Sequence, residues 1–279
     1  MAVPQEVTRY LADVTARVRD SFGDRVVGVY TTGSLALGDY HPGRSDIDLI
    51  AVVDGSPNLN LRWQLVQQLD HRVLHCPAAG LEFVLYPLTT VSRPRLDAGY
   101  LINFNTGAAL PPATSFDPGE GPAFWYPIDR AITRQSGAAL YGPPASQLFA
   151  ALPLDDLLRV VIASVEAQSD PQEDHLLDNA VLNGCRALTF AQDRRWYAKV
   201  AAAERTLPMV GEFAQLVSAA AASFDSGRQQ TTKLDPDTVR AFLLEVLQRL
   251  RSALPIELGK RVQHERLGQA SGGEVTQME

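Results

Sequence analysis

Two aspartates separated by one residue, Asp46 and Asp48, open an otherwise apolar run that ends at Val53 (DIDLIAVV). In an extended strand, residues two apart point to the same face, so the two carboxylates would sit side by side. Such a pair is costly to desolvate unless a cation neutralises it, and Mg²⁺ prefers carboxylate oxygens together with substrate phosphates. The pattern therefore indicates a magnesium site, although a capped turn at Ser45-Asp46 with Asp48 facing water would also produce it.

Gly33-Ser34 ends the preceding apolar run and is followed by Leu35-Ala36-Leu37, which is compatible with a first helical turn. Backbone N–H groups at a helix start suit an anion, and the Ser34 hydroxyl adds a donor. Glycine lets the backbone approach a phosphate closely. The dipeptide thus predicts a phosphate-binding turn; taken alone, it also fits a simple turn at the end of a strand.

Glu82 lies inside a third apolar run, Leu81–Leu85 (LEFVL). Acidic residues are unusual within buried strands. On a strand beside Asp46 and Asp48, Glu82 would complete a cluster of three carboxylates. It could then bind metal or act as general base on an attacking hydroxyl. An edge strand with Glu82 facing solvent is the alternative.

Hydrophobic periodicity predicts the elements that must position these residues. Its period is helical over 5–22 and 61–74, and short β-branched runs at 26–30, 46–53 and 81–85 predict strands. The segment 110–127 is rich in proline, glycine and aspartate and is expected to be a long surface connection. Helical periodicity then returns at 155–167, 176–190, 197–205, 209–224 and 239–254, the last after an N-cap aspartate and proline, Asp235-Pro236.

The predicted fold is α/β (α+β): a mixed sheet with helices, followed by an all-helical bundle. We expect an α/β domain over 1–148, a helical domain over 149–258 and a disordered tail over 259–279.

The 279-residue chain has a net charge of -7 and a pI of about 5.3. This argues against nucleic acid as the main partner and is compatible with a cationic small molecule. The sequence contains no apolar run of membrane-spanning length, and its N-terminus lacks the apolar core of a signal peptide. Cys76 and Cys185 are isolated, as expected of free buried thiols in a reducing cytosol. We therefore expect a cytoplasmic protein with no membrane partner.

Gly33-Ser34, the Asp46-Ile47-Asp48 tripeptide and the later strand acid together resemble the DNA polymerase β-like nucleotidyltransferase superfamily. Longer segments look like the aminoglycoside adenylyltransferases that modify streptomycin and spectinomycin. These segments are GRSDIDLIAVV, GLEFVLY, DRAITRQSGAALYGPP and LDNAVLNGCRALTFAQDRRWYAKVAAAE. The resemblance covers most of residues 20–210 and includes the helical region.

The resemblance implies an active site in a cleft between two domains, where AMP passes from ATP to a hydroxyl of a small, aminoglycoside-like molecule and pyrophosphate leaves. Asp46 and Asp48 would hold magnesium, and Glu82 matches the position of the catalytic base. The residues that would contact the triphosphate are Gly33, Ser34, Ser45, Arg186 and Lys199. Without the resemblance, Arg186 and Lys199 would be assigned to a solvated helix face.

Two departures concern the acceptor. Where the antibiotic-modifying enzymes have a tryptophan and an acid before the Asn179 helix, ungapped alignment places Ala167 and Gln172. Their tryptophan after the third strand falls near Asn105. The donor half of the reaction is thus specified better than the acceptor half. A natural-product or protein acceptor, or a non-catalytic antitoxin-like module with this fold, stays an alternative, and base preference and oligomeric state are not specified.

Overall fold

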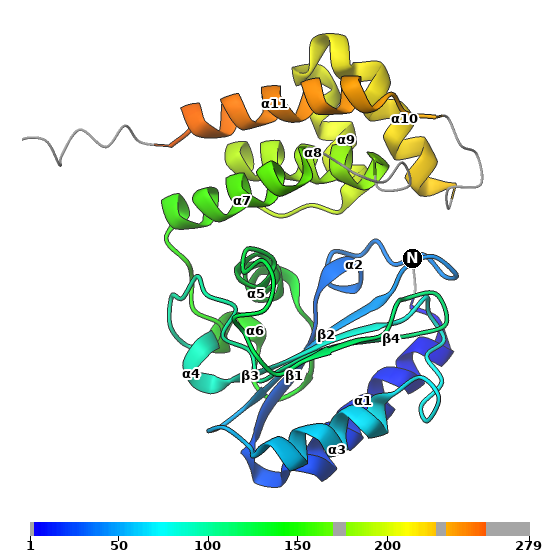
Figure 1. Ribbon diagram of the computed structural model, residues 1–279, viewed down its shortest axis with the longest axis vertical. Coiled ribbons are helices and arrows are strands. Elements are labelled where there is room, and N and C mark those ends of the chain that lie inside the picture. Colours follow the sequence, from blue (N-terminus) through cyan, green and yellow to red (C-terminus); the bar gives the residue numbers. More distant parts are fainter. Residues whose placement is uncertain (1–2, 170–176, 227–232, 255–279) are drawn as a thin grey trace, which may run out of the picture.

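The computed structural model describes residues 3–169, 177–226 and 233–254; Gln172 and the expected tail over 259–279 lie outside these described residues. A sheet with helices on both faces forms one half of the molecule, and a bundle of helices lies across the other (Figure 1). Among the described residues, no helix is both long and apolar enough to cross a membrane.

The sheet has six strands in the order β5-β4-β3-β2-β1-β6. β2 and β3 are parallel and the other neighbours are antiparallel, which confirms the predicted mixed sheet. The strands are β1 (Val26–Thr31), β2 (Ile47–Val53), β3 (Leu81–Pro87), β4 (Ile102–Thr106), β5 (Ala113–Ser115) and β6 (Ala139–Tyr141). The three strands expected from the sequence, β1, β2 and β3, are neighbours in this sheet.

β2 buries both of its faces. Ile47 and Leu49 belong to the core beneath the sheet, whereas Ile50 and Val52 belong to a second core on the other face. The first core is closed by α1 (Gln5–Phe22) and α3 (Leu59–Leu69), and the second by the short helices α4 (Leu88–Val91) and α6 (Ala145–Leu148) (Figure 1). This alternation confirms the prediction that the DIDLIAVV run is an extended strand whose alternate residues point to opposite faces.

The prediction of a long surface connection over 110–127 was wrong at two places. β5 (Ala113–Ser115) pairs with β4, and α5 (Trp125–Ser136) begins inside the segment. Both depend on tertiary contacts, because β5 is only a short edge strand and α5 has no capping side chain at its start. The second predicted helix is also shorter, since α3 ends at Leu69, where the Asp70 carboxylate accepts the Arg72 N–H in a turn.

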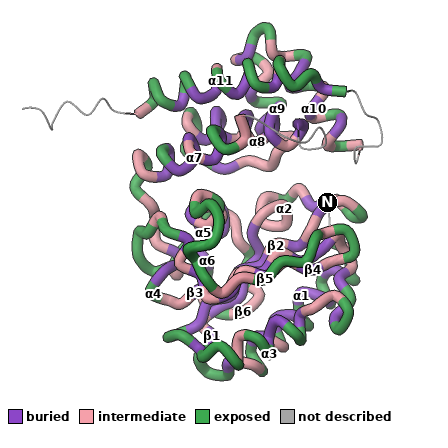
Figure 2. The backbone as a smooth tube through the Cα atoms, viewed as in Figure 1, coloured by how far each residue is buried: buried purple, intermediate pink, exposed green. Residues whose placement is uncertain are grey.

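The helical half consists of α7 (Leu154–Gln168), α8 (Leu177–Asp193), α9 (Lys199–Thr206), α10 (Ala214–Asp225) and α11 (Pro236–Ser252). The predicted N-cap is confirmed, because the Asp235 carboxylate accepts the Thr238 N–H at 3.0 Å. The helix expected over 209–224 instead starts with a 3₁₀ turn at Gly211–Phe213. α8 packs against the other four helices and is buried along most of its length (Figure 2).

α5 connects the two halves. It lies on the sheet side, yet Ile128 and Ile132 belong to the hydrophobic core of the helical bundle. Its buried Arg130 donates hydrogen bonds to the carbonyl oxygens of Ala98 and Arg95 at 3.0 and 2.8 Å. The helix is therefore held from both sides. The domain limits near 148 and 258 stay a prediction.

Candidate active site

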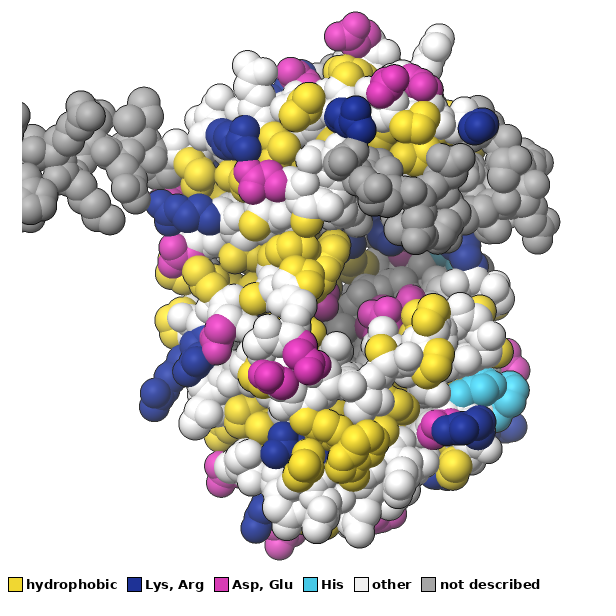
Figure 3. Space-filling view, in the orientation of Figure 1, with side chains coloured by type: hydrophobic (Ala, Val, Ile, Leu, Met, Phe, Trp, Pro, Cys, Tyr) yellow, Lys and Arg dark blue, Asp and Glu magenta, His cyan; other side chains and the backbone are white. Residues whose placement is uncertain are grey.

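A cavity of about 920 Å³ lies between the sheet and the helical half. The space-filling view shows the hollow between the two halves, with acidic side chains on the sheet side (Figure 3). Both halves line it, and every residue that the sequence placed in the site is among the lining residues: Gly33, Ser34, Ser45, Asp46, Asp48, Glu82, Arg186 and Lys199. The structure thus brings together side chains from positions 33 to 199 of the chain.

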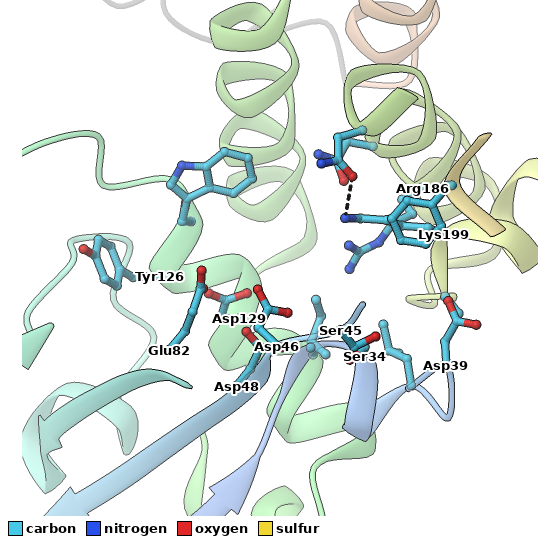
Figure 4. Close-up of a pocket in the computed structure, with 18 of the residues that line it drawn as sticks. Ser34, Asp39, Ser45, Asp46, Asp48, Glu82, Tyr126, Asp129, Arg186 and Lys199 are labelled. Carbon is cyan, nitrogen blue, oxygen red and sulfur yellow. Dashed lines mark hydrogen bonds between the residues drawn. The ribbon is translucent and has the colours of Figure 1, made fainter. Parts of the chain in front are cut away.

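Asp46, Asp48 and Glu82 form a compact cluster on the floor of the cavity (Figure 4). Asp48 and Glu82 are direct partners in the parallel register of β2 and β3, which confirms that Glu82 lies on the strand beside Asp48. One carboxylate oxygen from each residue lies within 4.8 Å of the others, so the three residues could hold a metal ion. Oxygen-only ligands of this kind suit magnesium.

The electrostatics of this cluster call for a cation. Burial raises the pKa of Asp48 well above its usual range, and the neighbouring Asp46 and Glu82 carboxylates raise it further. Burial, with Asp46 and Asp129 nearby, raises the pKa of Glu82 to about 7. Lys199 lowers both values without cancelling these effects. Like charges held this close disfavour ionisation unless positive charge is added.

Gly33 begins α2 (Gly33–Ala36) with φ of +55°, a conformation that favours glycine. An added Cβ would meet Asp48 Oδ2 at 1.9 Å, so only glycine leaves the carboxylate in place. The adjacent Ser34 hydroxyl is buried and has no hydrogen-bond partner among the described residues. A buried hydroxyl without a partner that lines a cavity is a candidate donor to a ligand.

Ser45 is buried, and its hydroxyl accepts a hydrogen bond from the backbone N–H of His41 at 3.0 Å. This bond closes the loop that leads from α2 into β2. The sequence-based expectation that Ser45 contacts a triphosphate stays a prediction.

Basic side chains face the carboxylates from the helical half (Figure 4). Lys199 begins α9 and donates to Asn179 Oδ1 at 3.0 Å. Arg186 projects from α8, and burial lowers the pKa of its guanidinium, an effect that Asp129 and Asp48 oppose. The Arg186 Nε is buried without a hydrogen-bond partner in the described part of the chain. The basic side chains lie opposite the carboxylates, and the space between them could hold a phosphate group together with a metal ion.

Arg44 and Asp129 are among the cavity residues that sequence reasoning missed. Arg44, on the loop before β2, stacks its guanidinium carbon 3.8 Å from the centre of the Phe224 ring and donates to the Phe224 carbonyl oxygen. Asp129 is in the second turn of α5, and burial raises its pKa to about 6 although Arg186 and Arg130 lower it. Arg44 precedes the Ser45-Asp46 pair, and Asp129 is the first residue of the segment DRAITR. No motif or residue spacing in the sequence singles out either of them.

The two acceptor-related departures also lie at the cavity. Asn105 on β4 is the register partner of Glu82, and Ala167 lies near the end of α7. Both line the cavity, so these two positions at which this chain differs from the antibiotic-modifying enzymes are part of the same site.

Comparisons with known proteins agree with this geometry. Residues 13–85 match the nucleotidyltransferase domain family, and residues 147–249 match the C-terminal domain of aminoglycoside adenylyltransferase. No curated protein sequence is significantly similar to the chain. The chain is a nucleotidyltransferase, and hence an enzyme. With its helical half included, it is a nucleotidyltransferase of the aminoglycoside adenylyltransferase type.

Solved structures support the fold. The spectinomycin adenyltransferase AAD(9) from Enterococcus faecialis, solved with ATP and spectinomycin, matches with a TM-score of 0.66 and 16% identity. The match covers 88% of this chain and 99% of that one, so both halves share the arrangement. A toxin–antitoxin structure with AMP-PNP matches with a TM-score of only 0.28 and 15% identity, over 58% of this chain and 92% of that one, which is too low to support an argument.

Proposed function

We propose that this enzyme transfers AMP from ATP to a hydroxyl group of a small, aminoglycoside-like molecule in a magnesium-dependent reaction. The observation that carries the proposal is one cavity in which the carboxylates of Asp46, Asp48 and Glu82 face the basic side chains of Arg186 and Lys199. A triphosphate needs both: cations for its oxygens, and carboxylates for the metal that accompanies it.

Asp46, Asp48 and Glu82 fit a magnesium ion, because the three carboxylates lie within reach of one point and destabilise one another in its absence. When bound there, the ion would stabilise negative charge that develops on the reacting phosphate and orient it. This fit rests on the donor set and on the raised pKa values of Asp48 and Glu82.

The protein groups have separate tasks in the proposed reaction. The Ser34 hydroxyl, which has no partner among the described residues, donates to a phosphate oxygen. Glu82 accepts the proton of the acceptor hydroxyl, whose oxygen attacks the α-phosphorus. The bond from that phosphorus to the oxygen of the β-phosphate breaks, and pyrophosphate leaves. Arg186 and Lys199 offset the charge on the departing group.

The size of the cavity and the comparison with the spectinomycin adenyltransferase support a small acceptor. A volume of about 920 Å³ lies in the range of sites that enclose a small-molecule ligand. The spectinomycin adenyltransferase, which has the same fold, was solved with ATP and spectinomycin. That likeness supports ATP as the donor and a small molecule as the acceptor.

The proposal is tested by incubating the protein with ATP, magnesium and a panel of hydroxyl-bearing antibiotics that includes spectinomycin and streptomycin. Mass spectrometry would detect the addition of one AMP unit, and pyrophosphate release would be measured in parallel. Asp46→Asn and Asp48→Asn should reduce turnover by at least a thousandfold while the proteins stay folded. Normal turnover in either variant would contradict the metal assignment.

The alternatives predict different outcomes. A natural-product or protein acceptor would give ATP–pyrophosphate exchange without modification of any panel member. A non-catalytic binding module would release no pyrophosphate with any acceptor, and the complete carboxylate cluster argues against it.

A further inference from the structure

The cavity has two chemically different ends. Seen in the close-up, Tyr126 and Asp129 lie on one side of Asp46 and Asp48, whereas Ser34, Arg186 and Lys199 lie on the other (Figure 4). We call the first side the acceptor end; its lining residues are Asn103, Asn105, Trp125, Tyr126 and Asp129. It carries amide, aromatic and carboxylate groups, and none of these five side chains is basic.

Two asparagine amides form the floor of the acceptor end. Asn105 pairs with Glu82 in the antiparallel register of β3 and β4, and Asn103 pairs with Val84. Asp48, Glu82 and Asn105 therefore form one row across three strands, with side chains on the same face. Neither asparagine side chain makes a hydrogen bond within the described part of the structure, so both amides are available to a ligand.

Asp129 forms the wall above this floor. Its backbone is held firmly, since its carbonyl oxygen accepts hydrogen bonds from the Thr133 and Thr32 hydroxyls at 2.7 and 3.3 Å. Its carboxylate lines the cavity but makes no hydrogen bond or ion pair with any residue that the structure describes. A carboxylate that is mostly desolvated and unpaired favours an added cation.

The opposite side of the cavity, which holds Ser34, Arg186 and Lys199, supplies no ion-pair partner for Asp129 among the described residues. Arg186 acts on Asp129 only through its charge, since the two side chains form no ion pair within the described residues. The metal cluster also excludes Asp129: the carboxylates that gather within 4.8 Å are those of Asp46, Asp48 and Glu82. Asp129 is nevertheless close enough to raise the pKa of Glu82.

We infer that Asp129 is a specificity-determining residue that binds an ammonium group of the acceptor, while the Asn105 and Asn103 amides bind its hydroxyls. This inference rests on the proposed function. Because Asp129 lies beside the base Glu82, the ammonium must lie near the reacting hydroxyl.

The test uses two ring fragments that differ in their amines. 2-Deoxystreptamine carries two amines and three hydroxyls on a cyclohexane ring, and myo-inositol carries hydroxyls alone. Each is titrated by calorimetry into the full chain loaded with magnesium and a non-hydrolysable ATP analogue. Binding of the analogue is measured first, and its failure would contradict the proposed function rather than this inference. Melting temperatures establish that each variant is folded.

Wild-type protein should bind 2-deoxystreptamine at least tenfold more tightly than myo-inositol. In Asp129→Asn this preference should disappear, and Asp129→Glu should restore part of it. Asn105→Ala should weaken both fragments by a similar factor, because it removes a contact to hydroxyls and not to the amine. The inference is overturned if Asp129→Asn keeps the preference, if wild type shows none, or if neither fragment binds. It is also overturned if Asp129→Asn instead weakens magnesium-dependent binding of the analogue, which would assign the carboxylate to the metal.

Discussion

Gly33 and Asp48 are in direct contact across the strand end: a Cβ placed on Gly33 would lie 1.9 Å from Asp48 Oδ2. The backbone reinforces the arrangement, because the N–H of Thr32 donates to the Asp48 carbonyl oxygen at 3.0 Å. The turn that leads to Ser34 therefore packs directly against a carboxylate of the candidate metal cluster. The glycine of the Gly33-Ser34 pair serves the metal cluster as well as the phosphate turn.

Gly33→Ala should abolish activity while the protein remains folded. The new methyl group must displace the Asp48 carboxylate, and φ of +55° adds a backbone strain of about 1 kcal/mol. We expect turnover to fall at least a hundredfold, with magnesium-dependent nucleotide binding weakened as well. Turnover and calorimetric binding would measure the two effects.

Gly55→Ala is the matched control for Gly33→Ala. Gly55 has φ of +73°, but an added Cβ meets no atom within 4 Å. It should lose a similar amount of stability and keep full activity. Equal activity losses in the two variants would show that backbone strain, and not the contact with Asp48, is responsible.

Glu82→Gln should inactivate the enzyme yet stabilise it without metal at alkaline pH. The pKa of Glu82 is about 7 in the folded protein, against an ordinary value of 4.5, so the folded state holds this proton more tightly. Stability from this group is complete below pH 4.5 and is lost as pH rises through about 7. The glutamine variant escapes that loss, which is about 3 kcal/mol for the shift from 4.5 to about 7.

Denaturant unfolding of metal-free protein at pH 4.5 and pH 8 would measure this effect. The two proteins should be similarly stable at the lower pH, and the variant more stable at the higher one. Magnesium should stabilise wild type at pH 8 and the variant less. A variant that is equally destabilised at both values would mean that Glu82 is not strained in the folded protein.

Arg44→Ala should loosen the contact between the two halves. The Arg44 guanidinium stacks 3.8 Å from the Phe224 ring centre at the end of α10, and the loop that carries it leads directly into β2. Loss of a cation–π contact and one hydrogen bond predicts destabilisation of about 1–2 kcal/mol. Urea unfolding would measure it, and Arg44→Lys should recover only part because lysine cannot present a planar fork. Full recovery in Arg44→Lys would mean that charge alone matters.

Arg130→Met should destabilise the sheet side of the cavity by about 3–5 kcal/mol. Arg130 is 5% exposed, and its guanidinium donates to the carbonyl oxygens of Arg95, Asp97 and Ala98. Methionine fills the space but leaves these acceptors unpaired. Arg72→Met is the control, because the Arg72 side chain is 86% exposed and pairs only with Asp70 in the described structure. Comparable unfolding midpoints for the two variants would contradict the anchoring role.

The central strands and the metal cluster could be predicted because their signals are local. Apolar alternation sets which face of β2 each residue occupies, and an acid inside an apolar run such as Glu82 stands out from its neighbours. The strands β4, β5 and β6 and the start of α5 were not predicted, because strands of three to five residues gain most of their stability from their partners. Asp129 was missed with them, since its importance depends on what α5 packs against.

By itself, the sequence determined the types and spacing of the residues that handle the donor: a glycine–serine turn, two aspartates in one strand and a glutamate in another. Only the tertiary structure decided that Asn105 lies beside Glu82, that the Asp129 carboxylate lines the cavity without a hydrogen-bond partner among the described residues, and that Arg186 and Lys199 face the carboxylates. The reason is physical. The glycine–serine turn and the aspartate pair are motifs whose members are close along the chain, whereas the rest of the site forms where strand register and helix packing bring distant side chains together.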